Sequence, residues 1–309
     1  MPPPQAILDK MRRLSAMLTT LRPQQWVKNL MLFLPLGLSH EADAAGPLLQ
    51  VTIAFFVMSL CASAIYVVND ICDRSSDKSH PRKKYRPLAI GTLSVAHAWA
   101  MIPGLLVPAV LCAFILLPQS FVVLIAVYLS LSLLYTLWLK QRRILDVLAL
   151  AVLYTLRVMA GGFAAGTLAS GWLLTLSFFL FLSLATIKRY AELVRLDTEG
   201  SFQAAGRAYD VANLKAIRAC GLASGYLAVV VFATYCYSQR AMELYPGIWA
   251  LRAICPLALF WIQRMWSLAE RNFALEDPVR FVVCDTISLV IAVIVIGLLV
   301  AAATPTGGL

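Results

Sequence analysis

The stretch Asn69-Asp70-Ile71-Cys72-Asp73-Arg74-Ser75-Ser76-Asp77 begins where a long uncharged run, residues 48–68, ends. That run is about 20 residues long, which is enough for a helix to cross a bilayer. If the helix continues past its end, Asp70, Asp73 and Asp77 fall at positions i, i+3 and i+7 and share one face. Three carboxylates there repel one another unless a cation lies between them. Carboxylate oxygens suit Mg²⁺, which binds through a few carboxylates together with substrate phosphates. The stretch therefore predicts a Mg²⁺–diphosphate site at a membrane surface, with a solvated acidic helix end as the alternative.

The composition is that of an integral membrane protein. Hydrophobic residues make up 61% of the 309 residues and charged residues 14%, with a mean hydropathy of +0.78. Soluble domains are typically about 45–50% apolar. Nine apolar segments, of which the first and sixth are short, lie between the charged stretches: 24–39, 48–68, 95–116, 119–138, 146–166, 172–187, 214–238, 247–263 and 281–303. We therefore expect an all-α protein with nine transmembrane helices in one domain, residues 21–309, after an amphipathic cytoplasmic segment, residues 1–20.

The distribution of positive charge predicts the orientation in the membrane. If the N-terminus is cytoplasmic, all but three of the 26 Lys and Arg residues lie on the cytoplasmic side. The positive-inside rule then puts the N-terminus and the long loops in the cytoplasm, and the C-terminus outside. The net charge of +10 is divided among loops between lipid-buried helices, so a nucleic-acid partner is not expected. The seven cysteines are scattered and form no C-x-x-C pair or zinc pattern.

Two of the cytoplasmic loops carry most of the remaining polar chemistry. In the first, four cations within five residues follow the acidic stretch: Arg82, Lys83, Lys84 and Arg86. Such a mixed field suits a phosphorylated, metal-bound ligand, although a purely topogenic role is the alternative. In the second loop, Lys188 and Glu192 are spaced i, i+4 at the end of a span, so an intrahelical pair and a substrate role are equally open.

Charged residues also fall inside or at the start of apolar spans. Lys28 enters the first span, where we expect it to have an anionic partner. Asp146, Arg157 and Asp285 are functional candidates by the same argument, with a structural ion pair or snorkelling as the alternative for each.

The pattern Asn69-Asp70-x-x-Asp73-x-x-x-Asp77, after the second of nine spans, resembles that of the UbiA superfamily of intramembrane prenyltransferases. Three strings more narrowly resemble its decaprenyl-phosphate phosphoribosyltransferase branch: Leu21-Arg22-Pro23-x-Gln25-Trp26-x-Lys28-Asn29, Arg86-Pro87-Leu88-Ala89-x-Gly91 and Lys188-Arg189-Tyr190-Ala191-Glu192-Leu193. Prenyl-diphosphate users in the superfamily carry a second aspartate-rich motif where this chain has the last of these strings. Its cations suit a ligand with an additional phosphate, such as phosphoribosyl pyrophosphate (PRPP).

The resemblance implies a UbiA-like bundle with cytoplasmic catalytic loops that transfers 5-phosphoribose from PRPP to a polyprenyl phosphate and releases pyrophosphate. It implies that Asp70, Asp73 and Asp77 hold Mg²⁺ together with Asn69, and that Glu192 stabilises positive charge at ribose C1. The substrate phosphates would meet a set of mostly basic side chains: Lys28, Arg82, Lys83, Arg86, Lys188, Arg189 and Tyr190. The product would serve cell-envelope synthesis, and a homo-oligomer is compatible with the sequence.

Two alternatives to this function remain. The first keeps the fold but uses a prenyl diphosphate donor and an aromatic acceptor, which Tyr66, Tyr135, Trp138 and Tyr154 could stack against. The second is a transporter or lipid-binding protein without chemistry, whose expected paired broken spans are weak here.

Overall fold

The computed structural model describes residues 5–39, 45–79, 83–198, 209–271 and 277–304. Within these ranges the structure is helical and contains no β-strand. The chain divides into two compact units, which are described separately: unit 1 is residues 1–140 with 156–168, and unit 2 is residues 141–155 with 169–309.

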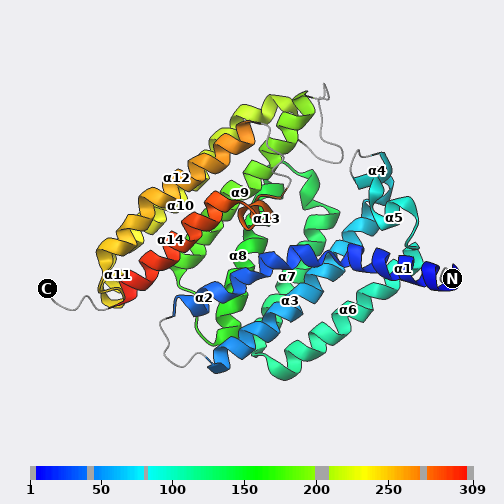
Figure 1. Cartoon of the computed structure of the whole chain (residues 1–309), viewed down its shortest axis with the longest axis horizontal. Coiled ribbons are helices and arrows are strands. Elements are labelled where there is room, and N and C mark those ends of the chain that lie inside the picture. The colour runs from blue at the N-terminus through cyan, green and yellow to red at the C-terminus, as the bar shows by residue number, and fades with distance from the viewer. Residues whose placement is uncertain (1–4, 40–44, 80–82, 199–208, 272–276, 305–309) are drawn as a thin grey trace. The chain divides into compact units, whose positions relative to one another are not determined.

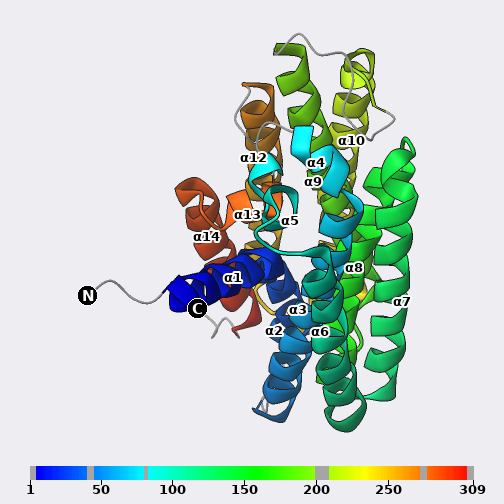
Figure 2. The ribbon, with the colours of Figure 1, turned by 90° about the vertical axis from the view of Figure 1, so that its right-hand side faces the viewer.

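Unit 1 is built around α3 (Ala45–Cys72), which packs along α6 (Val95–Leu116) (Figure 1). The N-terminal helix α1 (Gln5–Leu21) runs crosswise to both of them (Figure 2). Methionine and leucine side chains at positions 11, 14 and 18 of α1 are exposed, which is the i, i+3, i+7 pattern of an amphipathic helix. The other elements of unit 1 are α2 (Leu34–Gly37), α4 (Arg74–Ser79), η2 (Lys83–Tyr85), α5 (Pro87–Ile90), α7 (Gln119–Leu137) and the second half of α8 (Leu145–Ala165).

The first expected span, residues 24–39, is not a membrane-length α-helix. It consists of a 3-10 helix, η1 (Pro23–Phe33), followed by the four-residue α2. Side chains of α3 hold η1 in place, because Ser63 accepts a hydrogen bond from Trp26 at 3.0 Å and Ser59 accepts one from Asn29 at 2.9 Å. These bonds secure the polar residues of η1 to α3.

Eight helices of the described ranges are long and apolar enough to cross a membrane: Ala45–Cys72, Val95–Leu116, Gln119–Leu137, Leu145–Ala165, Gly171–Thr198, Val211–Cys236, Ile248–Glu270 and Thr286–Ala303. They correspond to the second to ninth expected spans. The expected count of nine is not confirmed, since residues 24–39 do not supply a helix of this length in the described part of the chain.

Unit 2 contains four long helices that lie side by side: α9 (Gly171–Thr198), α10 (Leu214–Cys236), α12 (Ile248–Glu270) and α14 (Thr286–Ala303) (Figure 1). A glycine permits the close approach of α10 and α12, because a Cβ atom at Gly221 would lie 2.1 Å from a ring carbon of Trp266. The Trp266 indole also donates a hydrogen bond to Ser183 at 3.1 Å, which links α12 to α9. Shorter elements complete the unit: the first half of α8, η3 (Leu139–Gln141) at the boundary, η4 (Val211–Asn213), α11 (Gln239–Leu244) and α13 (Pro278–Val282).

Asp285 forms an ion pair at the start of α14 whose contribution to stability depends on pH. Its carboxylate accepts two hydrogen bonds from Arg264, at 2.7 and 2.9 Å, and one from the Ser288 N–H at 2.8 Å. The hydrogen bond from Arg264 lowers the pKa of Asp285 from 3.8 to about 2. Partial burial raises this pKa, and the hydrogen bonds from Ser288 lower it further. Because the folded-state pKa lies below the ordinary value, the stabilisation is fully present above about pH 4 and is lost as the pH falls through about 2.

We expect Asp285→Asn to lower the free energy of unfolding at pH 7 by about 1–2 kcal/mol, since the carboxylate is partly solvated. The difference between variant and wild type should shrink as the pH is lowered from 4 towards 2. Unfolding of both proteins in detergent across this pH range measures it. A difference that stays constant down to pH 2 would show that the charge of Asp285 does not contribute.

Candidate functional site

The acidic stretch lies at the end of α3 and in α4, separated only by a turn at Asp73. Helical hydrogen bonds continue across this turn: the Asp73 N–H donates to the Asn69 carbonyl at 2.9 Å, and the Asp77 N–H donates to the Asp73 carbonyl at 2.8 Å. Asp70 and Asp77, two helical turns apart, therefore lie on the same side, and both are buried.

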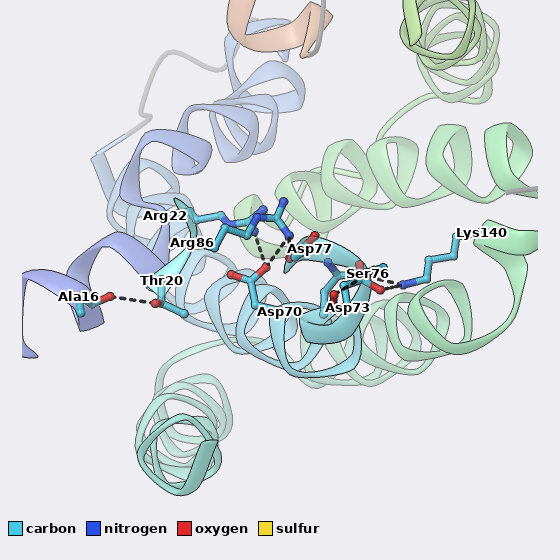
Figure 3. Close-up of polar contacts among 10 residues, drawn as sticks. Ala16, Thr20, Arg22, Asp70, Asp73, Ser76, Asp77, Arg86 and Lys140 are labelled. Atoms are coloured by element: carbon cyan, nitrogen blue, oxygen red, sulfur yellow. Dashed lines mark hydrogen bonds and ion pairs between the residues drawn. The ribbon is translucent and has the colours of Figure 1, made fainter. Parts of the chain in front are cut away.

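Two arginines neutralise this pair of carboxylates. Arg86 places one atom, Nη1, 3.1 Å from an Asp70 oxygen and 2.6 Å from an Asp77 oxygen (Figure 3). Arg22 places Nη2 2.5 Å from the same Asp70 oxygen, and its guanidinium lies 5.3 Å from the centre of the Tyr66 ring. Arg22 itself has a left-handed backbone, with φ 52° and ψ 57°, at the junction of α1 and η1. A side-chain-bearing residue adopts this conformation at some cost in energy, so its other contacts must hold it there.

Asp73 faces a different cation. Lys140, just beyond the end of α7, places its ammonium 2.6 Å from Asp73 and 3.5 Å from the side-chain oxygen of Asn69. Figure 3 shows it reaching Asp73 from the side away from the two arginines. Each of the three aspartates thus has a cationic partner that a phosphate group could share.

Arg22 and Lys140 were not among the site residues predicted from the sequence. Arg22 stands only in the Leu21–Asn29 string, without a separate role. Lys140 could have been proposed from the sequence, because it is the first charged residue after the fourth expected span. Under the positive-inside rule, the end of that span lies on the same side of the membrane as the acidic stretch. Their partners could not be read from the sequence, since they lie 48 and 67 residues away.

The donor groups here suit Mg²⁺ that arrives with a phosphorylated ligand. No three acidic, imidazole or thiol side chains in the described ranges lie close enough to hold a metal ion by themselves. Asp70 and Asp77 nevertheless converge on one positively charged atom, Nη1 of Arg86, which occupies the position a cation between them would take. Mg²⁺ typically uses one or two protein carboxylates, waters and substrate phosphates, so this pair fits it.

A second charged cluster lies within unit 2, between the start of α8 and the end of α9. Arg189 donates through Nε and Nη2 to the two carboxylate oxygens of Asp146, the latter at 3.0 Å, and through Nη1 to Glu192 at 2.8 Å. The side chains of Arg189 and Asp146 are 1% and 0% exposed, whereas that of Glu192 is 24% exposed. Lys188 is half-buried beside them, and the Tyr190 ring packs edge-on against Trp266 at 5.6 Å between centres.

The structure thus brings the predicted residues together in two groups, one in each unit. Asn69, Asp70, Asp73, Asp77 and Arg86 lie together in unit 1. Arg189 and Glu192 are in contact in unit 2. Two other predicted residues, Lys28 in η1 and Lys83 in η2, are buried and half-buried respectively, and Arg82 lies outside the described residues.

Arg157, in the middle of α8, belongs to a buried polar group in unit 1. Its Nε donates to Asn29 at 3.0 Å and its Nη2 donates to the Tyr128 hydroxyl at 2.7 Å, with the guanidinium 5.0 Å from the Tyr128 ring centre. These contacts connect α8 with η1 and α7.

Comparison with known proteins agrees with this architecture. One solved structure, a UbiA homolog from Archaeoglobus fulgidus bound to GPP and Mg²⁺, superimposes with a TM-score of 0.69 over 93% of this chain and 98% of that one, at 16% sequence identity. It shows a shared fold.

Several curated relatives match more closely in sequence. Uncharacterized protein y4nM of Sinorhizobium fredii is 32% identical to this chain over 90% of the chain's length. The chain spans about half (54%) of the length of that relative. Nodulation protein NoeC of Azorhizobium caulinodans is 32% identical over 87% of each chain. Decaprenyl-phosphate phosphoribosyltransferase of Mycolicibacterium smegmatis is 37% identical over 60% of each chain. The profile of the UbiA prenyltransferase family matches residues 30–284, and we conclude that the chain belongs to this family.

Proposed function

We propose that the protein transfers 5-phosphoribose from PRPP to a polyprenyl phosphate and releases pyrophosphate, in a Mg²⁺-dependent reaction at the cytoplasmic face of a bacterial inner membrane. The observation that carries the proposal is the convergence of Asp70 and Asp77 on the single Nη1 atom of Arg86, with Arg22 on the same Asp70 oxygen and Lys140 on Asp73. Three cations interleaved with three carboxylates suit a ligand that brings both phosphates and a metal ion.

The choice of donor and acceptor is supported by the similarity to decaprenyl-phosphate phosphoribosyltransferases, at 37% identity over about 60% of this chain. The cation at position 188 supports it as well, because PRPP carries a 5-phosphate in addition to its pyrophosphate. The alternative, prenyl transfer to an aromatic acceptor, gains no support from the solved structure of a UbiA homolog, because a likeness at 16% identity concerns the fold alone.

In the proposed mechanism, Asp70, Asp73 and Asp77, with Asn69, would hold Mg²⁺ together with the pyrophosphate of PRPP, which would supply the remaining oxygen ligands. When bound, Mg²⁺ neutralises the charge that develops on the leaving pyrophosphate oxygen. Three cations, Arg22, Arg86 and Lys140, exchange their carboxylate partners for phosphate oxygens of the substrate. The guanidinium groups of the two arginines are well suited to bind phosphate through two nitrogens. Lys28, Lys83, Arg82, Lys188 and Tyr190 are the further candidates for contacts to the substrates.

The reaction needs no general base. The acceptor is a lipid phosphate that is already ionised, so one of its oxygens forms the new bond to ribose C1 as the bond from C1 to the pyrophosphate oxygen breaks. Positive charge grows on C1 between these events, and the Glu192 carboxylate stabilises it. Attack opposite to the leaving group inverts C1, which gives a β-linked product from the α-configured donor.

A transfer assay tests the proposal. The protein, purified in detergent, is incubated with Mg²⁺, PRPP labelled in the ribose and a polyprenyl phosphate, and the lipids are extracted into organic solvent. We expect the label to enter the lipid phase and EDTA to abolish the transfer, with restoration by excess Mg²⁺. If no label moves with several lipid lengths, while the same preparation attaches a labelled prenyl diphosphate to an aromatic acceptor, the alternative function is correct.

A further inference from the structure

A buried arginine joins two carboxylates that differ in their access to solvent. Arg189 is 1% exposed and contacts Asp146, which is completely buried, through Nε and Nη2. Its remaining terminal nitrogen, Nη1, contacts Glu192, which is about a quarter exposed. A planar guanidinium with two nitrogens on one carboxylate cannot rotate freely, so its third nitrogen has a fixed direction. Asp146 therefore determines where Arg189 presents a positive charge to Glu192.

The burial of Arg189 also bears on how it acts. A side chain that binds a substrate phosphate directly needs a path to solvent, and the guanidinium of Arg189 faces carboxylates on both sides. Glu192 is the member of this trio that has an accessible surface. The trio thus leads from a fixed anchor inside the protein to a carboxylate that a ligand can reach.

The backbone that carries Asp146 is held unusually firmly. Ile144, two residues before it, has φ 66°, a left-handed value that is a genuine outlier for a β-branched residue. Its N–H donates to the Tyr209 hydroxyl at 2.8 Å, and the neighbouring Arg143 forms an ion pair with Asp210 at 3.1 Å. Tyr209 is itself buried, packed against Leu193 on the helix that carries Glu192. Strain of this kind persists only where the surroundings over-determine the backbone.

We propose that Asp146 and Arg189 are positioning residues, which hold the Glu192 carboxylate in the orientation it needs for phosphoribosyl transfer, and that Tyr209 secures the anchor by holding the Ile144 backbone. The inference rests on the proposed function, in which Glu192 acts at ribose C1. It assigns Arg189 a role through Glu192 in place of the direct phosphate contact that the sequence suggests, and it gives Asp146 a role that the sequence leaves open.

The test is a double-mutant cycle read out in both kcat and KM for PRPP, using the full chain in detergent. Glu192→Gln should lower kcat about 100-fold, because it removes a charge from the transition state. Asp146→Asn and Arg189→Lys should each lower kcat about 10-fold through misplacement of Glu192, with KM for PRPP changed less than about threefold. In the double variant D146N/E192Q, kcat should stay within about threefold of E192Q alone, because the anchor has nothing left to position.

A matched control and a milder variant accompany this cycle. Arg264→Lys disturbs another arginine of the same unit that holds an aspartate through two hydrogen bonds, with Asp285 in place of Asp146 as its partner. It should leave kcat within about twofold of wild type. If D146N does not fold, Tyr209→Phe takes its place: it removes only the hydroxyl that accepts from Ile144 and keeps the ring. It should lower kcat about threefold in the wild-type background and have no effect in E192Q.

The outcomes separate this inference from the proposed function. A 10-fold rise in KM for PRPP with unchanged kcat in R189K would show that Arg189 binds a substrate phosphate directly. Multiplicative effects of D146N and E192Q on kcat would show that Asp146 does not act through Glu192. Either result overturns the inference and leaves PRPP as the donor. If the wild-type protein transfers no phosphoribose, the proposed function fails, and the catalytic role of the trio fails with it. The same cycle measured by thermal unfolding would then still show whether Asp146 and Glu192 are coupled.

Discussion

Replacing Asp70 with asparagine is expected to lower phosphoribosyl transfer at least about 1,000-fold, because the change removes one of the carboxylates that we propose as Mg²⁺ ligands. A metal ion that neutralises a leaving group contributes several kcal/mol of transition-state stabilisation, and each 1.4 kcal/mol corresponds to a factor of ten. The amide keeps the size of the side chain but leaves Arg22 and Arg86 with one fewer negative partner in a buried position. The loss should therefore appear mainly in kcat and in the Mg²⁺ concentration needed for half-maximal rate.

The assay for this variant is the organic extraction of labelled lipid at a series of Mg²⁺ concentrations. Glu243→Gln is the matched control, because it removes a carboxylate from the exposed surface of the short helix α11. It should behave like the wild-type protein at every Mg²⁺ concentration. Wild-type rates in Asp70→Asn, with an unchanged Mg²⁺ requirement, would show that the metal does not bind at this carboxylate.

Gly161→Ala is expected to destabilise unit 1 by at least about 3 kcal/mol, with a fall of about 6 °C or more in the midpoint of thermal unfolding. A Cβ atom at this position in α8 would lie 1.9 Å from the backbone oxygen and 2.5 Å from the backbone carbon of Leu32. Backbone atoms cannot move aside as a flexible side chain can, so α8 and η1 would have to separate. The separation would also disturb the Arg157–Asn29 hydrogen bond between the same two elements.

Gly104→Ala in α6 provides the control, since a Cβ there meets nothing within 4 Å. Alanine is favoured over glycine in a helix interior by about 1 kcal/mol, so this variant should be neutral or slightly stabilised. The comparison is made by thermal unfolding of both variants in the same detergent, monitored by a thiol-reactive fluorescent dye or by tryptophan fluorescence. Equal midpoints for the two variants would show that α8 and η1 do not approach each other as closely as described.

The hydrophobic runs of the sequence predict most of the helices well. Expected spans at 95–116 and 119–138 become Val95–Leu116 and Gln119–Leu137, because prolines and polar residues mark their ends. The span expected at 172–187 instead continues to Thr198, since a helix does not need apolar residues once it leaves the lipid. The 3-10 helix at Pro23–Phe33 could not be foreseen, because its bonds to Ser59 and Ser63 come from another helix.

The candidate site is predictable as residue types in a pattern but not as a set of contacts. Asp70 and Asp77 stand two helical turns apart in the sequence, so their position on one side follows from local geometry alone, whereas Asp73 faces Lys140. Their cationic partners Arg22 and Lys140 depend on how distant helices pack, and nothing in the local sequence specifies that. The role of Asp146 was open for the same reason, since its partner Arg189 lies 43 residues further along the chain.

The buried contacts of Arg157 have a consequence for how the chain enters the membrane during synthesis. An arginine near the centre of a membrane helix costs about 2.5–3.5 kcal/mol to insert, even on scales derived from cellular insertion. Two of its hydrogen-bond partners, Asn29 and Tyr128, precede α8 in the chain, so they leave the ribosome first. The earlier segments can therefore receive the guanidinium as α8 arrives, which makes the N-terminal half of this protein an assembly template for the helix that follows it.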